Sequence, residues 1–436
     1  MRSRKIRSGK NLKIRKISAA AIGLFLVLFM TAGIRQYSEA AEDGLSVVMR
    51  PDHPFRAIVV SDLHYTSSER AVDVIVSGMA FADDITNALV EQVIHEAPDA
   101  FIMTGDNTNS GARKDAEILA GKLSRIREAG IPVIVTTGNH DMRVNDPTVF
   151  EDCYWNLFDP VERDPASSSY VQIINGTALF AMDDNAVEMG GAGRFSPNTM
   201  EWLKKMLKTY APVCPVVFLC HHNVLVGLGE EGTESYRIQN EDLAQLLREN
   251  NVHLILSGHL HSQMLEEWNG VYEVVNAMPL GGEHAIGKLE ITRSPGEEPE
   301  NENNDLVRMT YRIEPMDLEA YGREGLAEEL AEKDLLRSER FRDWFYQILE
   351  RTGCPETERD LAADLMEAFF RYYEEGILAD HKKEILMNPV YQVMIDALWD
   401  TNYGPWMKAT LETTARNAGS VEISYLMENA DKLPVR

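Results

Sequence analysis

The chain has 436 residues, 44% of them hydrophobic, and its formal net charge is −26. This apolar content excludes an intrinsically disordered protein, and the length predicts two or three structural units. Because the acidic body repels phosphate backbones and contains no local basic patch, the composition argues against a long nucleic acid as partner.

The first 41 residues have the features of an export segment. A basic stretch ends at Lys16, an uncharged apolar run covers residues 17–34, and Ser38-Glu39-Ala40 forms a small-x-small cleavage sequence. An apolar run of this length suits either a cleaved signal peptide or a short membrane anchor, so both interpretations stay open. In either case the basic flank predicts a body exported beyond the cytoplasmic membrane, secreted or anchored, which contacts the membrane only through this segment.

Residues 55–289 alternate short apolar runs with amphipathic stretches. The runs at 56–62, 100–106 and 132–138 predict buried strands, with helices between them over 85–97 and 114–129. Strand and helix in alternation indicate an α/β fold. Later strands are expected over 178–182, 216–220, 253–257, 271–276, 287–292 and 307–313, and a helix is expected to begin at Pro197 with Ser196 as its N-cap.

The composition changes after residue 315. Glu, Leu, Ala, Arg and aromatic residues then recur at helical spacing as far as Leu426, which predicts an all-α domain over 316–436 following an α/β domain over 50–315. An aromatic stripe on one predicted helix indicates a core face, formed by Phe341, Trp344, Phe345 and Ile348. These apolar stripes need a partner surface, which is either the α/β domain or a second copy in a homo-oligomer.

Five of the predicted strands are followed at once by residues whose side chains can bind metal ions. They are Asp62, His64, Asp106, Asn139, His140, Asp141, His221, His259 and His261. Because ligands of open α/β sheets bind at the carboxyl ends of the strands, we expect these side chains to converge. Oxygen and imidazole ligands suit divalent ions, and Asp106 is the natural bridge between two of them. Glycines just before ligands, at 105, 138 and 258, are expected to allow tight turns.

In order and spacing these motifs resemble those of the calcineurin-like metallophosphoesterase superfamily, D-x-H, G-D, G-N-H-[DE], H and G-H-x-H, over residues 55–313. The resemblance implies a layered β-sandwich flanked by helices and two divalent ions, with Mn, Fe and Zn all compatible. It implies one ion held by Asp62, His64, Asp106 and His261, and a second held by Asp106, Asn139, His221 and His259. His140 would face the phosphate without binding metal.

The same resemblance implies hydrolysis of a small phosphoester substrate. The two ions would clamp the phosphate and activate water, while His140 would donate a proton to the leaving oxygen and Asp141 would orient the His140 imidazole. The sequence His221-His222-Asn223 and the helical C-terminal region look like a bacterial exported subgroup of cyclic-nucleotide phosphodiesterases. Small cyclic nucleotides are therefore the expected substrates.

Two other functions stay open. The same fold could act as a phosphomonoesterase, a nucleotidase or a pyrophosphatase. A non-catalytic metal-binding scaffold is an alternative from another class, although the chain retains every expected ligand and His140. Near the motifs, His222 and His284 are expected to be packing or hydrogen-bonding residues, and Asp183-Asp184-Asn185 is expected to form a turn.

Overall fold

The computed structural model describes residues 53–67, 80–144, 146, 148–187, 192–229, 236–295, 304–374, 377–401, 403–412, 415 and 419–428. The predicted signal peptide or anchor, residues 1–41, lies outside these residues. Within them, none of the helices combines the length and the apolar character that crossing a bilayer requires.

In the described part of the chain thirteen strands form two sheets, and the first sheet has six strands in the order β13-β12-β11-β1-β2-β3. Strands β1, β2 and β3 are parallel, and β11, β12 and β13 continue the sheet in antiparallel fashion. Their bounds are β1 Phe55–Val60, β2 Ala100–Met103, β3 Val133–Val135, β11 Ala285–Pro295, β12 Asn304–Pro315 and β13 Ser420–Glu428.

The second sheet has seven strands in the order β4-β5-β6-β7-β8-β10-β9. Strands β6, β7, β8 and β10 are parallel, and β4, β5 and β9 pair antiparallel at the two sides. Their bounds are β4 Glu162–Arg163, β5 Tyr170–Ile174, β6 Thr177–Ala181, β7 Val216–Leu219, β8 Leu254–Ser257, β9 Met264–Trp268 and β10 Val271–Val275.

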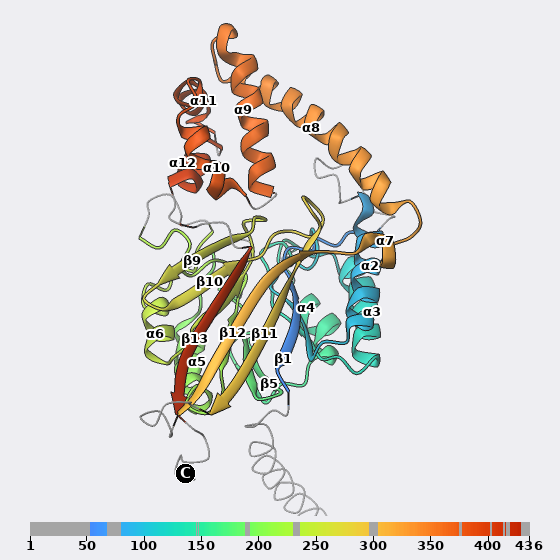
Figure 1. Cartoon of the computed structure of the whole chain (residues 1–436), viewed down its shortest axis with the longest axis vertical. Helices are drawn as coiled ribbons and strands as arrows, with labels where there is room; N and C mark the ends of the chain where they lie inside the picture. The colour runs from blue at the N-terminus through green and yellow to red at the C-terminus, as the bar shows by residue number, and fades with distance from the viewer. Residues whose placement is uncertain are drawn as a thin grey trace, which may run out of the picture. The chain divides into compact units, whose positions relative to one another are not determined.

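Helices cover both sheets (Figure 1). In the α/β part these are α2 Ala82–Glu96, α3 Arg113–Glu128, α4 Thr148–Tyr154, the 3-10 helix η2 Trp155–Leu157, α5 Pro197–Tyr210 and α6 Leu243–Glu249. The predicted start of α5 is confirmed, because the Ser196 side chain accepts a hydrogen bond from the Thr199 amide at 3.1 Å.

The alternation of side chains along β7 explains the layers. Val217 and Leu219 belong to the same buried cluster as residues of the first sheet, such as Val59. Val216 and Phe218 point the other way, into a cluster shared with α5 and α6. Both faces of this sheet are therefore buried, which is why its strands are continuous apolar runs. The predicted α/β fold with a β-sandwich flanked by helices is confirmed.

The C-terminal helices pack around a third apolar core, which they share with Val226, Leu260 and Val275 of the α/β part. They are α7 Leu318–Tyr321, α8 Leu326–Arg351, α9 Glu356–Glu374, α10 Leu378–Leu386, α11 Tyr391–Leu398 and α12 Tyr403–Glu412. The aromatic stripe of α8 faces this core, since Phe345 is fully buried and Phe341, Trp344 and Ile348 pack around it. This confirms the interpretation of the stripe as a packing surface.

The prediction of helix as far as Leu426 is wrong for the last described segment. Strand β13 pairs with β12 over nine residues, from Asn304 opposite Glu428 to Arg312 opposite Ser420. Val421, Ile423 and Met427 are buried, whereas the residues between them are more exposed, so the segment has the period of two that a half-buried strand requires. Helices α7 to α12 are thus inserted between two strands of one sheet, and a boundary at residue 315 divides that sheet.

Candidate metal centre

Two sheets contribute to the site, each at the carboxyl ends of its parallel strands. Asp62 follows β1 and Asp106 follows β2 in the first sheet, whereas His221 follows β7 and His259 follows β8 in the second. The two edges touch, because the Thr104 hydroxyl donates to the Ser257 carbonyl at 3.4 Å. The sequence predicted convergence at one sheet edge, but the structure joins the edges of two sheets.

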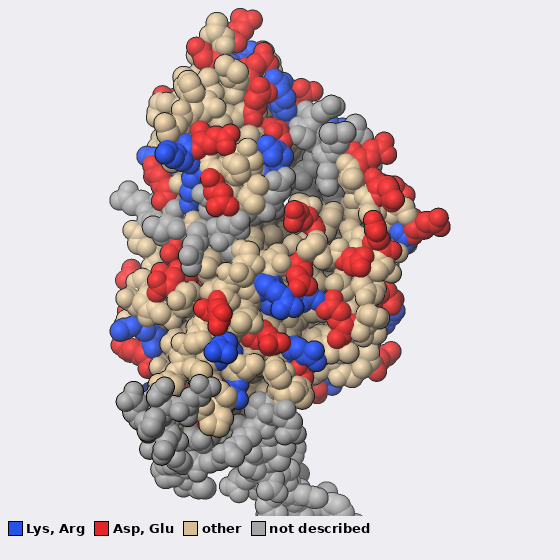
Figure 2. All heavy atoms as spheres, viewed as in Figure 1, with Lys and Arg blue, Asp and Glu red and all other residues tan. Residues whose placement is uncertain are grey.

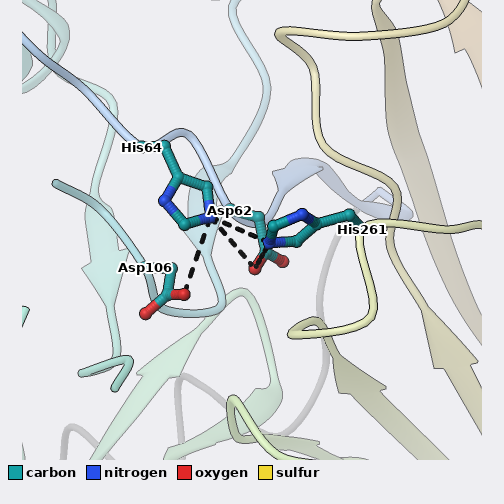
Figure 3. Close-up of side chains that lie close together, drawn as sticks. All are labelled: Asp62, His64, Asp106 and His261. Carbon is teal, nitrogen blue, oxygen red and sulfur yellow. Dashed lines mark hydrogen bonds and ion pairs between the residues drawn. The ribbon is translucent and has the colours of Figure 1, made fainter. Parts of the chain in front are cut away.

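Four side chains form a first group, called here the Asp62 cluster, which consists of Asp62, His64, Asp106 and His261 (Figure 3). The Nε2 atom of His64 lies 2.9 Å from Nε2 of His261, 3.7 Å from Oδ1 of Asp62 and 3.6 Å from Oδ2 of Asp106. His261 Nε2 is 3.3 Å from the same Asp62 oxygen. All four side chains thus aim one donor atom at a common point.

A second group, called here the Asn139 cluster, consists of Asp106, Asn139, His221 and His259. Asn139 Oδ1 lies 3.0 Å from His221 Nε2 and 2.9 Å from His259 Nδ1. His221 Nε2 is 3.4 Å from Oδ2 of Asp106. The structure therefore brings together all seven residues predicted as metal ligands, in the two groups that the sequence motifs imply; their role as ligands stays a prediction.

The oxygen shared by both clusters tests whether metal ions fit. Oδ2 of Asp106 is buried and has no hydrogen-bond donor among the described residues. An ionised carboxylate oxygen without a donor is costly inside a protein, and a divalent cation on each side would satisfy it. Aspartate, asparagine and imidazole groups are ligands that such ions accept, so the residues present fit a divalent metal centre.

The charges of the site reinforce one another. Burial by itself raises the pKa of Asp106, but the neighbouring His221, with electrostatic contributions from His64 and His140, outweighs this effect and holds the pKa far below its usual range. Burial lowers the pKa of His221, yet the Asp106 and Asp62 carboxylates outweigh it and raise the pKa to about 10. The carboxylates therefore stay ionised and provide negative charge where a cation would bind.

Backbone strain is concentrated at the same residues. Asp62, His64, Asp106, His259 and His261 have φ angles of 53°, 43°, 47°, 71° and 57°, in the left-handed region that non-glycine residues rarely adopt. They are five of the ten non-glycine residues with positive φ in the described part of the chain. Strain of this kind persists only where the surrounding structure imposes it, and it is typical of functional sites.

The three glycines of the motifs act in two ways. Gly105 has a φ of 92° and makes the tight turn that was expected. All three glycines also provide space, because a Cβ atom would overlap His221 at Gly105, Asp106 at Gly138, and Ser61 and Asp62 at Gly258. Side chains of the ligands occupy the volume that a larger residue would need.

His140 lies at the edge of both clusters. Its Nε2 atom is 3.9 Å from Oδ2 of Asp106, and its Nδ1 atom lies 2.9 Å from the Asn109 carbonyl. A carbonyl only accepts hydrogen bonds, so Nδ1 carries a hydrogen and Nε2 is the nitrogen that faces the site. Burial and the neighbouring His64 lower the pKa of His140 to about 3.

The expected role of Asp141 is wrong. Its carboxylate does not contact the His140 imidazole but accepts five hydrogen bonds from Asn107, Thr108 and Gly138, at 2.8 to 3.1 Å. Asp141 therefore ties the loop after β2 to the turn that carries Asn139 and His140. The orienting partner of His140 is the Asn109 carbonyl, a main-chain group that side-chain motifs do not reveal.

Residues 55–263 match the family model described as calcineurin-like phosphoesterase. This part of the chain is a calcineurin-like phosphoesterase domain. This match confirms the predicted family, and the prediction of a metal-dependent phosphoesterase is confirmed for the domain.

Similar proteins include a probable glycerophosphodiester phosphodiesterase of Arcobacter nitrofigilis, 26% identical over 207 residues that cover 45% of this chain and 70% of the relative. A cAMP/cGMP dual specificity phosphodiesterase of Mycobacterium tuberculosis is 28% identical over 215 residues, 49% of this chain and 63% of the relative. Among solved structures, a dimetal phosphatase from Danio rerio matches with a TM-score of 0.43 and 13% identity, covering 60% of this chain and 96% of that one.

The phosphoesterase domain also uses a carboxylate that the sequence interpretation assigned to a turn. Oδ2 of Asp184 accepts the amide hydrogens of His221 at 3.0 Å and His222 at 2.9 Å, and Oδ1 lies 3.0 Å from His222 Nδ1. Asp184 is fully buried and fixes the loop that carries His221. Its position directly after a strand, as for the ligands, was the available signal.

The two histidines near the motifs that were expected to be structural, His222 and His284, have hydrogen-bonding partners. His222 contacts Asp184, and His284 places Nδ1 2.9 Å from the Pro279 carbonyl. On the face shown in Figure 2, the described acidic and basic side chains are interspersed, without a broad basic area.

Proposed function

We propose that the chain hydrolyses small phosphodiesters with two divalent metal ions, one at the Asp62 cluster and one at the Asn139 cluster. The observation that supports this most is the oxygen of Asp106 that both clusters share, 3.6 Å from His64 Nε2 and 3.4 Å from His221 Nε2. Bound ions supply Lewis-acid chemistry, which activates water and neutralises phosphate charge.

The protein's own groups position the reaction. The two clusters define where the phosphate binds, and His140 presents Nε2 beside them, where the leaving oxygen of the substrate needs a proton. A phosphate anion next to His140 favours the protonated imidazole, because opposite charges stabilise each other. The contact between His140 Nδ1 and the Asn109 carbonyl keeps the ring in this orientation.

The substrates that we propose are small phosphodiesters, and cyclic nucleotides are the first candidates among them. The relative from Mycobacterium tuberculosis is named for hydrolysis of cAMP and cGMP, and the relative from Arcobacter nitrofigilis is named for glycerophosphodiesters. Both names describe phosphodiesterases. Phosphomonoesters and pyrophosphates are the runner-up substrates of the same site.

The test is turnover by metal-reconstituted protein. The chain is loaded separately with Mn, Fe or Zn, its bound metal is counted, and it is assayed with cyclic AMP, cyclic GMP, a glycerophosphodiester, a chromogenic diester and a chromogenic monoester. Preference for the diesters supports the proposal, and preference for the monoester supports the runner-up. If the protein binds two ions and hydrolyses none of these substrates, it is the non-catalytic scaffold.

We also propose that the catalytic part is exported, secreted or anchored by residues 1–41. The supporting observation is the order of basic residues, uncharged apolar run and small-x-small sequence. Expression of the full chain in a bacterium, followed by fractionation, tests it. Recovery of the whole protein in the cytoplasm would contradict export, and the mass of the exported protein would distinguish cleavage from anchoring.

A further inference from the structure

Arg143 lies next to the candidate catalytic histidine, and no motif or prediction above assigns it a role. It follows His140 by three residues in a turn in which the Arg143 amide donates to the His140 carbonyl at 3.3 Å. The side chain folds back, so that Nη2 of its guanidinium contacts Nε2 of His140. That imidazole nitrogen is 3.9 Å from the Asp106 oxygen shared by both clusters. A single atom, Nε2 of His140, thus contacts the guanidinium and lies near the oxygen at the centre of the site.

Among the described residues, Arg143 has no ion-pair partner that would neutralise its charge. No carboxylate of the described residues lies within ion-pair distance of it. Arg125 and Arg127 show the usual situation in this acidic chain, with Glu91 at 2.5 Å and Asp159 at 2.7 Å. A guanidinium without a carboxylate, placed beside a site for anions, is available to bind one.

The contact with His140 indicates what the guanidinium does without substrate. Since Nδ1 of His140 carries the hydrogen that faces the Asn109 carbonyl, Nε2 accepts the hydrogen bond from Arg143. While this contact lasts, Nε2 is not free to act on a leaving group. An incoming phosphate oxygen is a stronger acceptor for arginine than a neutral imidazole is, because it is charged.

The turn that carries Arg143 is held from inside the domain. Five hydrogen bonds to Asp141 connect this turn to Asn107, Thr108 and Gly138. The backbone of the turn is therefore fixed while the Arg143 side chain, which is exposed, can exchange one acceptor for another. A fixed backbone combined with a mobile guanidinium, whose N–H groups donate hydrogen bonds, suits binding of a phosphate group.

We propose that Arg143 binds a non-bridging oxygen of the substrate phosphate and, in doing so, leaves Nε2 of His140 free for the leaving oxygen. The ligand class is an anionic phosphoester, and inorganic phosphate carries the same chemistry. This inference rests on the proposed function for its substrate. It assigns Arg143 to substrate binding and not to metal binding.

The experiment measures inorganic phosphate binding by calorimetry on the Mn-loaded full chain, without turnover. Arg143→Ala should weaken phosphate binding about 10-fold to 100-fold, the loss of one hydrogen bond to a charged group. The phosphate affinity of Arg143→Lys should lie between those of the wild type and Arg143→Ala, since lysine keeps the charge but loses the planar guanidinium. Arg125→Ala, which removes an exposed arginine paired with Glu91, is the matched control and should stay within about twofold.

Turnover and metal content complete the test. KM for the diester should rise in Arg143→Ala by a similar factor, with bound Mn unchanged. Unchanged phosphate affinity in a folded, Mn-loaded Arg143→Ala protein would overturn the inference, and so would loss of Mn. If Arg143→Ala does not fold, Arg143→Lys decides by the same measurements. If the wild type hydrolyses no phosphoester but binds phosphate through Arg143, the proposed function fails while this inference stands.

Discussion

The Nε2 atoms of His64 and His261 lie 2.9 Å apart, although 197 residues separate them in the chain. Two imidazole nitrogens at this distance repel each other unless a proton or a cation lies between them, since each neutral ring has one lone pair. Asp62 Oδ1 lies close to both nitrogens, at 3.7 Å and 3.3 Å. The arrangement fits the prediction of ligands around a cation, and it makes the shared carboxylate of Asp106 the first group to test.

Asp106→Asn should abolish hydrolysis and reduce bound metal. The change replaces the carboxylate that both clusters share with a neutral amide, so we expect affinity for metal to fall by at least about 100-fold, more than the loss of an outer-shell partner usually causes. Metal analysis and turnover of the chromogenic diester measure it. Asp159→Asn, which alters an exposed carboxylate paired with Arg127, is the control. Full metal content with normal turnover in Asp106→Asn would remove the dinuclear model.

His140→Ala should lose turnover and keep its metal, because the residue faces the clusters without belonging to either. General acid catalysis contributes about 100-fold to 10,000-fold, so a loss of this size is expected with a poor leaving group. With a nitrophenolate leaving group, which needs no proton, the loss should be smaller. If the variant binds one ion fewer, His140 is a ligand and the assignment of the clusters is wrong.

Asp184→Asn should weaken the Asn139 cluster and spare the Asp62 cluster. The amide cannot accept hydrogen bonds from two main-chain groups and the His222 ring as a carboxylate does, so the His221 loop loses its anchor. Loss of such a support typically costs about 10-fold to 100-fold in metal affinity. Metal titration should show one weakened ion of two. Asp164→Asn, a buried carboxylate that accepts hydrogen bonds from Ala166 and Ser167 and from no residue of a ligand loop, is the control and should leave both affinities in place.

The inserted helices should affect substrate preference and the loop of His259 and His261, without supplying a catalytic group. The Ser262 hydroxyl donates to the Tyr373 carbonyl of α9, and Leu260 packs in the core of the helices. Replacing residues 341–415 by a short linker should leave hydrolysis of a small chromogenic diester at saturating metal, with a shifted preference among larger phosphoesters. Hydrogen exchange at 258–262 should become faster.

A truncation after residue 315 is the informative comparison for that variant. It removes β13 as well as the helices, and so strips nine paired residues from the edge of β12. Its Tm should therefore be lower than that of the linker variant. Complete loss of small-diester hydrolysis in a folded, metal-loaded linker variant would mean that the helices contribute a catalytic residue.

The sequence alone determined which candidate ligands converge, because each one follows a buried strand and parallel strands bring their carboxyl ends together. It also determined the apolar face of α8, since helical spacing defines that face locally. The partners of Asp141 and Asp184, the contact of Arg143 with His140 and the pairing of β13 with β12 were decided only by the tertiary structure. A hydrogen bond to a main-chain amide or carbonyl leaves no pattern in the sequence, and a strand that pairs across an inserted domain has its partner about a hundred residues away. Local periodicity defines which face of a segment is apolar, but only packing selects the surface that this face meets.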